Sequence, residues 1–279
     1  MLFRGVGLGA VAVELAAGTG YGRLMSTFVE GEHNWIVRLG NLRNTVRQEV
    51  MRRQLAGHVT AGMTVLDVGC GQGTQAVELA KLGCVVTGVE PSPELRRLCV
   101  TAAQEVGVTV KVIDGTIENL AQLITDDSFD LVCAHGLLMY LPDRTLALRQ
   151  LARFVRPGGD LSITFRNGHA LAMRPGLRQD WSAALSAFGS RGYVNELGVV
   201  AEAHLLDEVT ADLAELGLDL VAWYGVRVFT DWVDSSMPPP TGDDLQELFN
   251  AEDRAGRLDP YRWMASMLHV VVHAPAATT

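Results

Sequence analysis

Lysine, paired cysteine motifs and long apolar runs are scarce or absent in this sequence of 279 residues. Only Lys81 and Lys111 are lysines among its 23 basic residues, which face 32 acidic ones, and the formal net charge is −9. A negative net charge argues against a broad nucleic-acid-binding surface but is compatible with a local basic groove. No stretch reaches the roughly 18 consecutive apolar residues of a transmembrane helix, so we expect no membrane association.

The cysteines and histidines lack the spacings of disulfide-rich or metal-binding proteins. The four cysteines form no C-x-x-C pair, and the seven histidines form no H-E-x-x-H motif or close cluster. Scattered cysteines favour a reducing cytoplasm, and the histidine pattern predicts no metal site. The N-terminal stretch MLFRGVGLGAVAVELAAG has the look of a signal peptide, but Glu14 interrupts it and no clear A-x-A site follows. We therefore expect a cytoplasmic protein.

From residue 64 onward, short apolar runs alternate with helical segments. The runs are continuous rather than alternating, which is typical of parallel strands that are covered on both faces. Strand–helix alternation predicts a doubly wound α/β sheet. The expected strands are Thr64–Val68, Val85–Val89, Val108–Ile113, Phe129–Ala134 and Asp160–Phe165, and the expected helices are Thr74–Lys81, Pro93–Glu105, Ile117–Leu123 and Arg144–Val155.

The segments on either side of this core have a different character. Residues 41–59 carry an apolar stripe that predicts an amphipathic helix, on which Arg43 and Arg47 share a face that is either solvated or functional. We divide the chain into an N-terminal extension with this lid helix (1–60) and one domain (61–279), in which 167–200 form an irregular insertion that completes the lid. The expected C-terminal elements are a helix at Leu206–Leu216, a strand near Leu218–Thr230, a short helix at Leu245–Ala251 and a strand at Leu268–His273, with one edge strand antiparallel.

The stretch VLDVGCGQGTQ (65–75) places three glycines at every second position after the first expected strand. Open α/β sheets bind ligands at such a loop, where glycines allow close approach of the backbone. A dinucleotide fingerprint needs its third glycine at the position of Thr74, and the G-K-[ST] of a phosphate-binding P-loop is absent. Glu90 ends the second expected strand, where a carboxylate can accept both hydroxyls of a ribose.

The glycine spacing and Glu90 together resemble class I S-adenosylmethionine-dependent methyltransferases. Asp114-Gly115-Thr116, FDLVCAHGLLMYLPD (129–143) and RFVRPGGDLSITF (153–165) resemble further motifs of this family, in the same order. The resemblance implies a Rossmann-like, seven-stranded doubly wound sheet with its last strand antiparallel, S-adenosylmethionine as cofactor and S-adenosylhomocysteine as product. The residues that it assigns to the cofactor are Arg47, Asp67, Gly69, Cys70, Gly71, Gly73, Glu90, Pro91, Asp114, Gly115, Thr116, Ile117 and His135.

A narrower resemblance extends beyond these motifs. VRQEVMRRQL (46–55), RNGHALAM (166–173), YGVRVFTDW (224–232) and DPY…LHV (259–270) resemble the bacterial tRNA 5-carboxymethoxyuridine methyltransferases. This resemblance implies that Arg47 approaches the methionine carboxylate, for which bidentate pairing is the physical reason. The broader resemblance to class I methyltransferases implies that Asp114 meets the adenine amine. The family has Glu-Trp where this chain has Met139-Tyr140, so contacts with the acceptor differ here.

Two kinds of oxygen acceptor fit these residues. A carboxylate is ionised at neutral pH and needs a cationic clamp, for which Arg166, Arg174 and Arg227 are the candidates by resemblance. A hydroxyl needs a general base, for which His135 is the best placed and His169 the second. His135 has cofactor packing as its alternative role, and Tyr140 is a pocket wall or a catalyst.

The acceptor itself stays open at this point. Residues 144–178 hold seven arginines and one acid, whereas residues 201–259 hold fourteen acids and three arginines. The first stretch forms either a basic rim for tRNA or a solvated face. The alternatives are a small-molecule acceptor, a modified tRNA base, a protein acceptor, or a module that binds S-adenosylmethionine without catalysis, in a chain that is a monomer or a homodimer.

Overall fold

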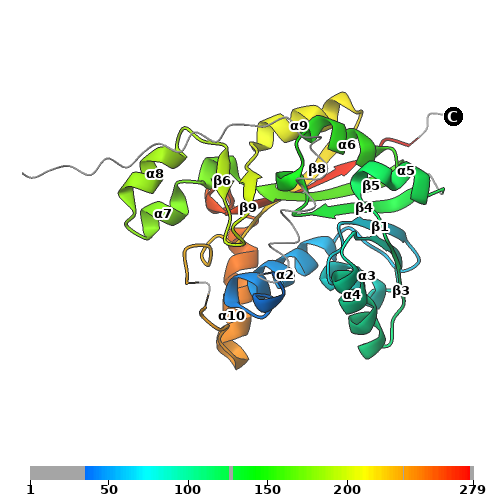
Figure 1. Ribbon diagram of the computed structural model, residues 1–279, viewed down its shortest axis with the longest axis horizontal. Coiled ribbons are helices and arrows are strands. Elements are labelled where there is room, and N and C mark those ends of the chain that lie inside the picture. Colours follow the sequence, from blue (N-terminus) through cyan, green and yellow to red (C-terminus); the bar gives the residue numbers. More distant parts are fainter. Residues whose placement is uncertain (1–34, 126–127, 235, 277–279) are drawn as a thin grey trace, which may run out of the picture.

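A mixed seven-stranded sheet forms the centre of the computed structural model, which describes residues 35–125, 128–234 and 236–276 (Figure 1). The strand order is β3-β2-β1-β4-β5-β9-β8, and β9 is antiparallel to both of its neighbours. The doubly wound sheet with one antiparallel strand is thereby confirmed. The strands are β1 (Thr64–Val68), β2 (Val85–Val89), β3 (Val110–Ile113), β4 (Phe129–His135), β5 (Val155–Arg166), β8 (Asp219–Val226) and β9 (Met267–His273).

Helices cover both faces of the sheet, which explains why its central strands are largely apolar. Figure 1 shows α2 (Leu42–Leu55), α3 (Thr74–Lys81), α4 (Pro93–Glu105) and α10 (Gly242–Ala255) on one face, with α5 (Leu120–Leu123), α6 (Arg144–Ala152) and α9 (Leu206–Glu215) on the other. The apolar stripe of α2 is fully buried, with Val46 and Val50 inaccessible to solvent. Two hydrophobic clusters, one on each face, form the core.

Side-chain caps fix where several of these helices begin. The Asn41 side chain accepts a hydrogen bond from the Asn44 backbone N–H at the start of α2. Ser92 does the same for α4, and Asp143 for α6. Such caps satisfy backbone donors that have no partner within the helix, so the boundaries next to the carboxyl edge of the sheet follow from local sequence.

Several expected boundaries differ from the structure: β3 begins at Val110 rather than Val108, and α6 ends at Ala152 rather than Val155. β5 begins at Val155 rather than at residue 160, because the R-P-G-G segment continues the strand beside Phe129 through an irregular register. A Cβ atom at Gly159 would lie 2.9 Å from the Phe129 carbonyl oxygen, so this close approach requires glycine. The expected short helix 245–251 is the 14-residue α10, and the expected strand 218–230 ends at Val226.

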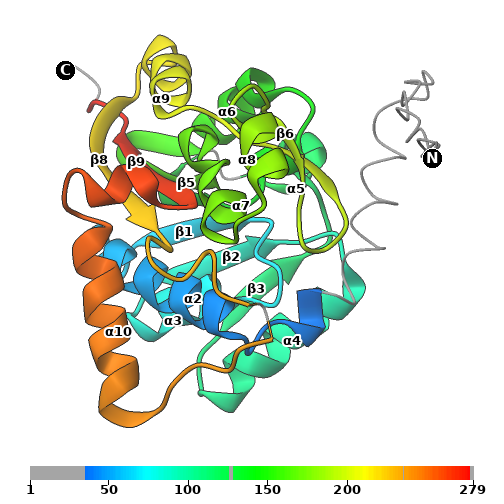
Figure 2. The same cartoon turned by 90° about the vertical axis from the view of Figure 1, so that its left-hand side faces the viewer.

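The insertion 167–200 is more regular than expected. It contains α7 (Met173–Leu177), α8 (Trp181–Ala187) and β6 (Gly192–Val194), and β6 pairs with β7 (Val200–Glu202) as an antiparallel hairpin. Figure 2 shows α7 and α8 above α2, with the segment after β8 crossing in front of α2. Short 3₁₀ turns lie at Ile117–Asn119, Leu138–Tyr140, Gly168–Ala170 and Tyr261–Met264.

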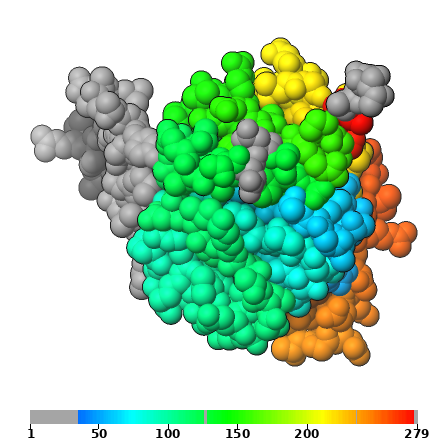
Figure 3. Space-filling model, turned by 90° about the vertical axis from the view of Figure 1, so that its right-hand side faces the viewer, coloured from blue at the N-terminus to red at the C-terminus, as the bar shows by residue number. Residues whose placement is uncertain are grey.

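The opposite side of the molecule is formed largely by residues 60–150, with α9 above and α10 below (Figure 3). Most of the expected N-terminal extension, residues 1–34, lies outside the described residues, and so does Glu14. Within the described part of the chain, no helix has the length and apolar character needed to span a membrane. The division at residue 60 stays a prediction.

Candidate functional site

A cavity of about 1240 Å³ opens at the carboxyl edge of the parallel strands, between α2, the β6–β7 hairpin and the loops that follow β1, β2, β3 and β4. This is the edge at which open α/β sheets bind ligands. Eleven of the thirteen residues assigned to a cofactor line the cavity, and Gly73 and Asp114 do not. Of the expected acceptor residues, Tyr140, Arg166, Arg174 and Arg227 also line it, whereas His169 does not.

The glycine loop takes a conformation that only glycine adopts without strain. Gly69, Gly71 and Gly73 have φ values of 72°, 57° and 82°. A Cβ atom at Gly73 would overlap the Cys99 sulfur of α4, so this glycine serves packing rather than the cavity wall. Gly69 and Cys70 both donate backbone hydrogen bonds to the Val89 carbonyl, which ties the loop to the end of β2.

Glu90 lies directly after β2 and points into the cavity beside this loop. One of its carboxylate oxygens accepts a hydrogen bond from the Gly71 backbone N–H at 3.0 Å, and the other accepts one from Ser92 at 2.9 Å. The residue is only 3% exposed. A buried carboxylate that is anchored on both oxygens is a fixed acceptor, and an acceptor of this kind suits the two hydroxyls of a ribose.

Asp67, the last but one residue of β1, is buried in the floor of the cavity. Burial, and secondly the nearby Glu90 carboxylate, raise the pKa of Asp67 to about 7. Ionising a second carboxylate in this confined space is unfavourable without a cation. A positively charged ligand would relieve this repulsion, so the two acids favour a cationic group in the cavity.

Arg47 of α2 is buried on the other wall. Its guanidinium lies 4.7 Å from the centre of the Trp35 ring, and the Trp35 indole donates to Gln72 of the glycine loop at 2.9 Å. Burial lowers the pKa of Arg47 to about 10. No carboxylate of the described residues forms an ion pair with Arg47. Within that part of the chain, a buried guanidinium therefore faces the cavity without an acidic partner, as an anion-binding group would.

Asp114 lies outside the cavity lining. Both of its carboxylate oxygens accept from Arg96 of α4, at 2.9 and 3.0 Å, and its side chain is 73% exposed. Arg96 also donates to the carbonyls of Glu90 and Pro91. In this structure Asp114 therefore helps to hold the end of β2 against α4, while Gly115, Thr116 and Ile117 line the cavity next to it.

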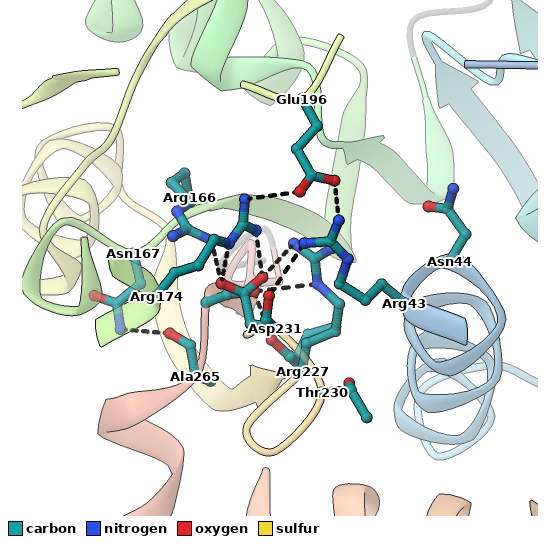
Figure 4. Close-up of polar contacts among 12 residues, drawn as sticks. Arg43, Asn44, Arg166, Asn167, Arg174, Glu196, Arg227, Thr230, Asp231 and Ala265 are labelled. Atoms are coloured by element: carbon teal, nitrogen blue, oxygen red, sulfur yellow. Dashed lines mark hydrogen bonds and ion pairs between the residues drawn. The ribbon is translucent and has the colours of Figure 1, made fainter. Parts of the chain in front are cut away.

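The other half of the cavity is an arginine cluster. Arg166 at the end of β5, Arg174 on α7 and Arg227 after β8 converge on the Asp231 carboxylate (Figure 4). Arg174 donates to both Asp231 oxygens, at 2.6 and 2.9 Å, and the other two arginines lie at 3.3 Å. Burial lowers the pKa of Arg227 to about 9. One carboxylate thus balances three guanidiniums.

The turn that carries Asp231 is itself held by a buried acid. Glu252 of α10 is fully buried and accepts backbone hydrogen bonds from residues 228, 229 and 230, together with the Thr230 hydroxyl. At the entrance to this turn Arg227 adopts a φ of 61°, which is costly for a residue with a side chain. Packing by α10 therefore imposes the conformation that brings Arg227 and Asp231 together.

His135 ends a chain of buried hydrogen bonds that crosses four elements. The Gln54 side-chain nitrogen donates to the Gly225 carbonyl, which identifies the other amide atom of Gln54 as its oxygen. This Gln54 oxygen accepts from His269 Nδ1, at 2.8 Å. His269 Nε2 then accepts from the Ser162 hydroxyl, at 2.8 Å, and Ser162 accepts from His135 Nε2, at 2.9 Å. Which atom donates and which accepts in this chain follows from the number of donors and acceptors that each side chain has.

The remaining nitrogen of His135 is thereby left without a proton. His135 Nδ1 is buried and has no hydrogen-bond partner among the described residues. Burial, and secondly the charge of Arg47, lower the pKa of His135 to about 3. His135 is thus a neutral ring whose one nitrogen is engaged and whose other nitrogen is shielded from solvent.

Tyr140 and Met139 contact the β6–β7 hairpin, which sequence reasoning treated as irregular. The Asn195 amide donates to the Tyr140 hydroxyl at 2.8 Å, and the Tyr193 hydroxyl donates to the Met139 sulfur at 3.3 Å. The Arg166 guanidinium lies 5.6 Å from the centre of the Tyr193 ring. The hairpin therefore closes the acceptor half of the cavity.

Sequence reasoning missed several residues of the site. They are Trp35, Arg38, Tyr193, Asn195, Glu196 and Asp231, and Arg43 was left with two roles open. Asp231 lies within the YGVRVFTDW segment (224–232), whose resemblance to the tRNA methyltransferases could have pointed to it. Tyr193, Asn195 and Glu196 of the insertion lie in no such motif. Within the described residues, no group of three or more His, Cys, Asp or Glu side chains is arranged to hold a metal ion.

Comparisons with known proteins agree with this geometry. Residues 66–163 match the family model for a methyltransferase domain. The chain is 36% identical over 123 residues to a ubiquinone biosynthesis O-methyltransferase of Methylobacterium sp., but spans only about half of that protein's length, 49%. It is 26% identical over 240 residues to the tRNA 5-carboxymethoxyuridine methyltransferase of Escherichia coli K12, which covers 85% of this chain and 89% of that protein.

Solved structures show the same fold. An S-adenosylmethionine-dependent methyltransferase of Methanosarcina mazei has a TM-score of 0.56 at 18% identity, over 80% of this chain and 97% of that one. The magnesium protoporphyrin IX methyltransferase of Synechocystis, with bound S-adenosylhomocysteine, has a TM-score of 0.55 at 15% identity, over 89% and 94%. At these identities the likeness concerns the fold.

Proposed function

We propose that this chain is an S-adenosylmethionine-dependent methyltransferase and that it transfers the methyl group of that cofactor to an oxygen of a carboxylate-bearing acceptor. When bound, S-adenosylmethionine supplies an electrophilic methyl group on its sulfonium. The observation that carries the proposal is the cavity's division into two halves. One half holds Glu90, Asp67 and the glycine loop, and the other holds three arginines on one buried carboxylate.

The residues of the first half fit the cofactor chemically. Glu90 presents fixed carboxylate oxygens for ribose hydroxyls, and Arg47 offers a buried guanidinium for the methionine carboxylate. Asp67 favours a positive charge beside it. Gly115, Thr116 and Ile117 form the wall next to Glu90, where an adenine would lie. These roles, together with the contact of Asp114 with the adenine amine, are what we propose for the cofactor half.

The second half supports a carboxylate rather than a hydroxyl acceptor. Arg166, Arg174 and Arg227 form a cationic wall that can hold and orient an anion for in-line attack. A hydroxyl acceptor needs a base within hydrogen-bond reach. His135 does not suit that task, because Nε2 is engaged by Ser162 and Nδ1 is buried. We therefore assign His135 to the support of the cofactor half, and Tyr140 to the cavity wall.

The acceptor is either a small molecule or a modified tRNA base. The similarity to the Escherichia coli tRNA methyltransferase, which extends over 85% of this chain, favours tRNA. The negative net charge and the ubiquinone-pathway relatives favour a small molecule. We also propose a cytoplasmic location, which the four free buried cysteines support. The proposed assembly is a monomer or a homodimer.

The chemistry of the product tests the proposal. The protein is incubated with S-adenosylmethionine labelled in its methyl group and with either bulk tRNA or a cell extract of small molecules, and the products are treated with mild alkali. A methyl ester releases its label as volatile methanol, whereas a methyl ether keeps it. We expect volatile label from one of the two fractions. Arg174→Ala should reduce this label at least tenfold, because Arg174 supplies two of the hydrogen bonds that order the cluster.

A matched control separates this role from a general loss of charge. Arg178→Ala removes an exposed arginine one helical turn away, whose side chain donates to the backbone carbonyls of Trp232 and Val233, and should leave the label almost unchanged. Alkali-stable label alone would contradict a carboxylate acceptor. Tight cofactor binding without transfer to either fraction would instead favour a non-catalytic binding module.

A further inference from the structure

Glu196 brings a second carboxylate into the arginine cluster, and it comes from the hairpin that covers the cavity. It lies in the loop between β6 and β7 and forms an ion pair with Arg43 of α2 (Figure 4). Arg38 and Arg174 lie 3.5 and 3.6 Å from its carboxylate oxygens. Three guanidiniums from two separate segments therefore share this single acid. Arg174 also belongs to the set of three that shares Asp231.

The two acids differ in how firmly they are held. Asp231 is buried, does not line the cavity, and is bonded on both oxygens within a turn that Glu252 fixes. Glu196 lines the cavity, and its side chain is 30% exposed. Asp231 is thus a permanent counterion of the cluster, whereas Glu196 can leave the cluster for solvent.

The backbone of the β6–β7 loop does not have to move for the Glu196 side chain to leave the cluster. The Asn195 side chain accepts hydrogen bonds from the N–H groups of Leu197 and Val199, and the Asn195 backbone N–H bonds to the Val199 carbonyl. Asn195 also anchors the loop to Tyr140. With the loop held in this way, rotation about the side-chain bonds of Glu196 is sufficient to vacate the arginines.

The charge balance of the cluster shows what the departure of Glu196 would cause. Five arginines, at positions 38, 43, 166, 174 and 227, face Asp231 and Glu196. Arg43 is only 2% exposed, and its one further side-chain hydrogen bond among the described residues goes to the Asp231 backbone carbonyl. If Glu196 left alone, Arg43 would be buried without an ion-pair partner among the described residues, which is strongly unfavourable. Another anion must therefore take the place of Glu196.

We propose that Glu196 occupies the position of the acceptor's anionic group while no acceptor is bound, and that an anionic acceptor displaces it. The inference rests on the proposed function in one respect, namely that the displacing anion is the methyl acceptor. Displacement by an anion is a property of the arginine cluster itself. Glu196 then determines specificity, because a neutral compound cannot replace it at Arg43 and Arg174, whereas a carboxylate can.

Binding of a simple dicarboxylate tests the displacement without any turnover. The full chain, saturated with S-adenosylhomocysteine, is titrated with succinate by calorimetry in a buffer free of chloride. Glu196→Gln keeps the size of the side chain and removes its charge, so succinate no longer competes with it. We expect Glu196→Gln to bind succinate at least tenfold more tightly than the unchanged protein does.

Glu202→Gln is the matched control, because it alters the net charge equally at an exposed position of the adjoining β7. Equal or weaker succinate binding in Glu196→Gln than in Glu202→Gln would overturn the inference, and Glu196→Ala repeats the comparison without an amide. Binding of S-adenosylhomocysteine, measured in the same variants, reports on the cofactor half. Its loss would count against the proposed function, whereas unchanged succinate affinity would count against displacement of Glu196.

Discussion

Asp231→Asn is the change that probes the arginine cluster most directly. The substitution keeps the size of the side chain and removes the one charge that Arg166, Arg174 and Arg227 share at distances of 2.6–3.3 Å. The four side chains are between 7% and 21% exposed, so water compensates poorly for the lost carboxylate. Breaking a buried ion pair by removing one partner costs about 3–5 kcal/mol, and the three remaining guanidiniums also repel one another. We expect the free energy of unfolding to fall by about this amount.

Denaturation by urea, followed by tryptophan fluorescence, measures the loss. Asp253→Asn is the control. Asp253 of α10 pairs at 3.0 Å with Arg257, which follows that helix, and a surface pair of this kind contributes less than about 1 kcal/mol. Inorganic sulfate should recover part of the stability of Asp231→Asn beyond its general effect on the control. A loss no larger than that of Asp253→Asn would refute the electrostatic account of the cluster.

The pH dependence of the same variant follows from the pKa of Asp231. Three guanidiniums outweigh the effect of burial and hold this pKa well below its usual value of 3.8. The native state therefore keeps the carboxylate ionised where the unfolded chain becomes protonated. The contribution of Asp231 is fully present above about pH 4 and is lost as the pH falls toward the folded-state pKa. Asp231→Asn should lack this part of the acid-induced loss of stability.

Two further predictions concern the cofactor half. Arg47→Gln should weaken binding of S-adenosylhomocysteine by about 10–100-fold, the equivalent of a charged hydrogen bond of about 1.5–3 kcal/mol; Arg53→Gln on the same helix is the calorimetric control, and an equal loss in both would exclude a specific contact. Affinity of the unchanged protein should rise as the pH increases through about 7, because Asp67 becomes ionised beside the ligand's ammonium group. Asp67→Asn should flatten this dependence in titrations from pH 6 to 8, and a persistent slope would assign it to another group.

Several features of the site were predictable because they depend on short windows of sequence. The three glycines of the loop are marked by their spacing, and all three adopt positive φ values. Glu90 is marked by its place at the end of an apolar strand, and there it accepts from Gly71. Asp114 has an equally clear local signal, but Arg96, one helical turn into α4, engages both of its carboxylate oxygens outside the cavity.

The sequence by itself determined the order of strands and helices from β1 to β5, the glycine loop and the edge of the sheet at which the cavity forms. These follow from hydrophobic period, turn residues and helix caps, which act between near neighbours. Only the tertiary structure decided that Arg43, Arg174, Glu196 and Asp231 meet, since they come from a lid helix, an insertion helix, a hairpin loop and a turn after β8. Ion pairs between such distant segments depend on chain path and shared burial, which leave no periodic trace in the sequence.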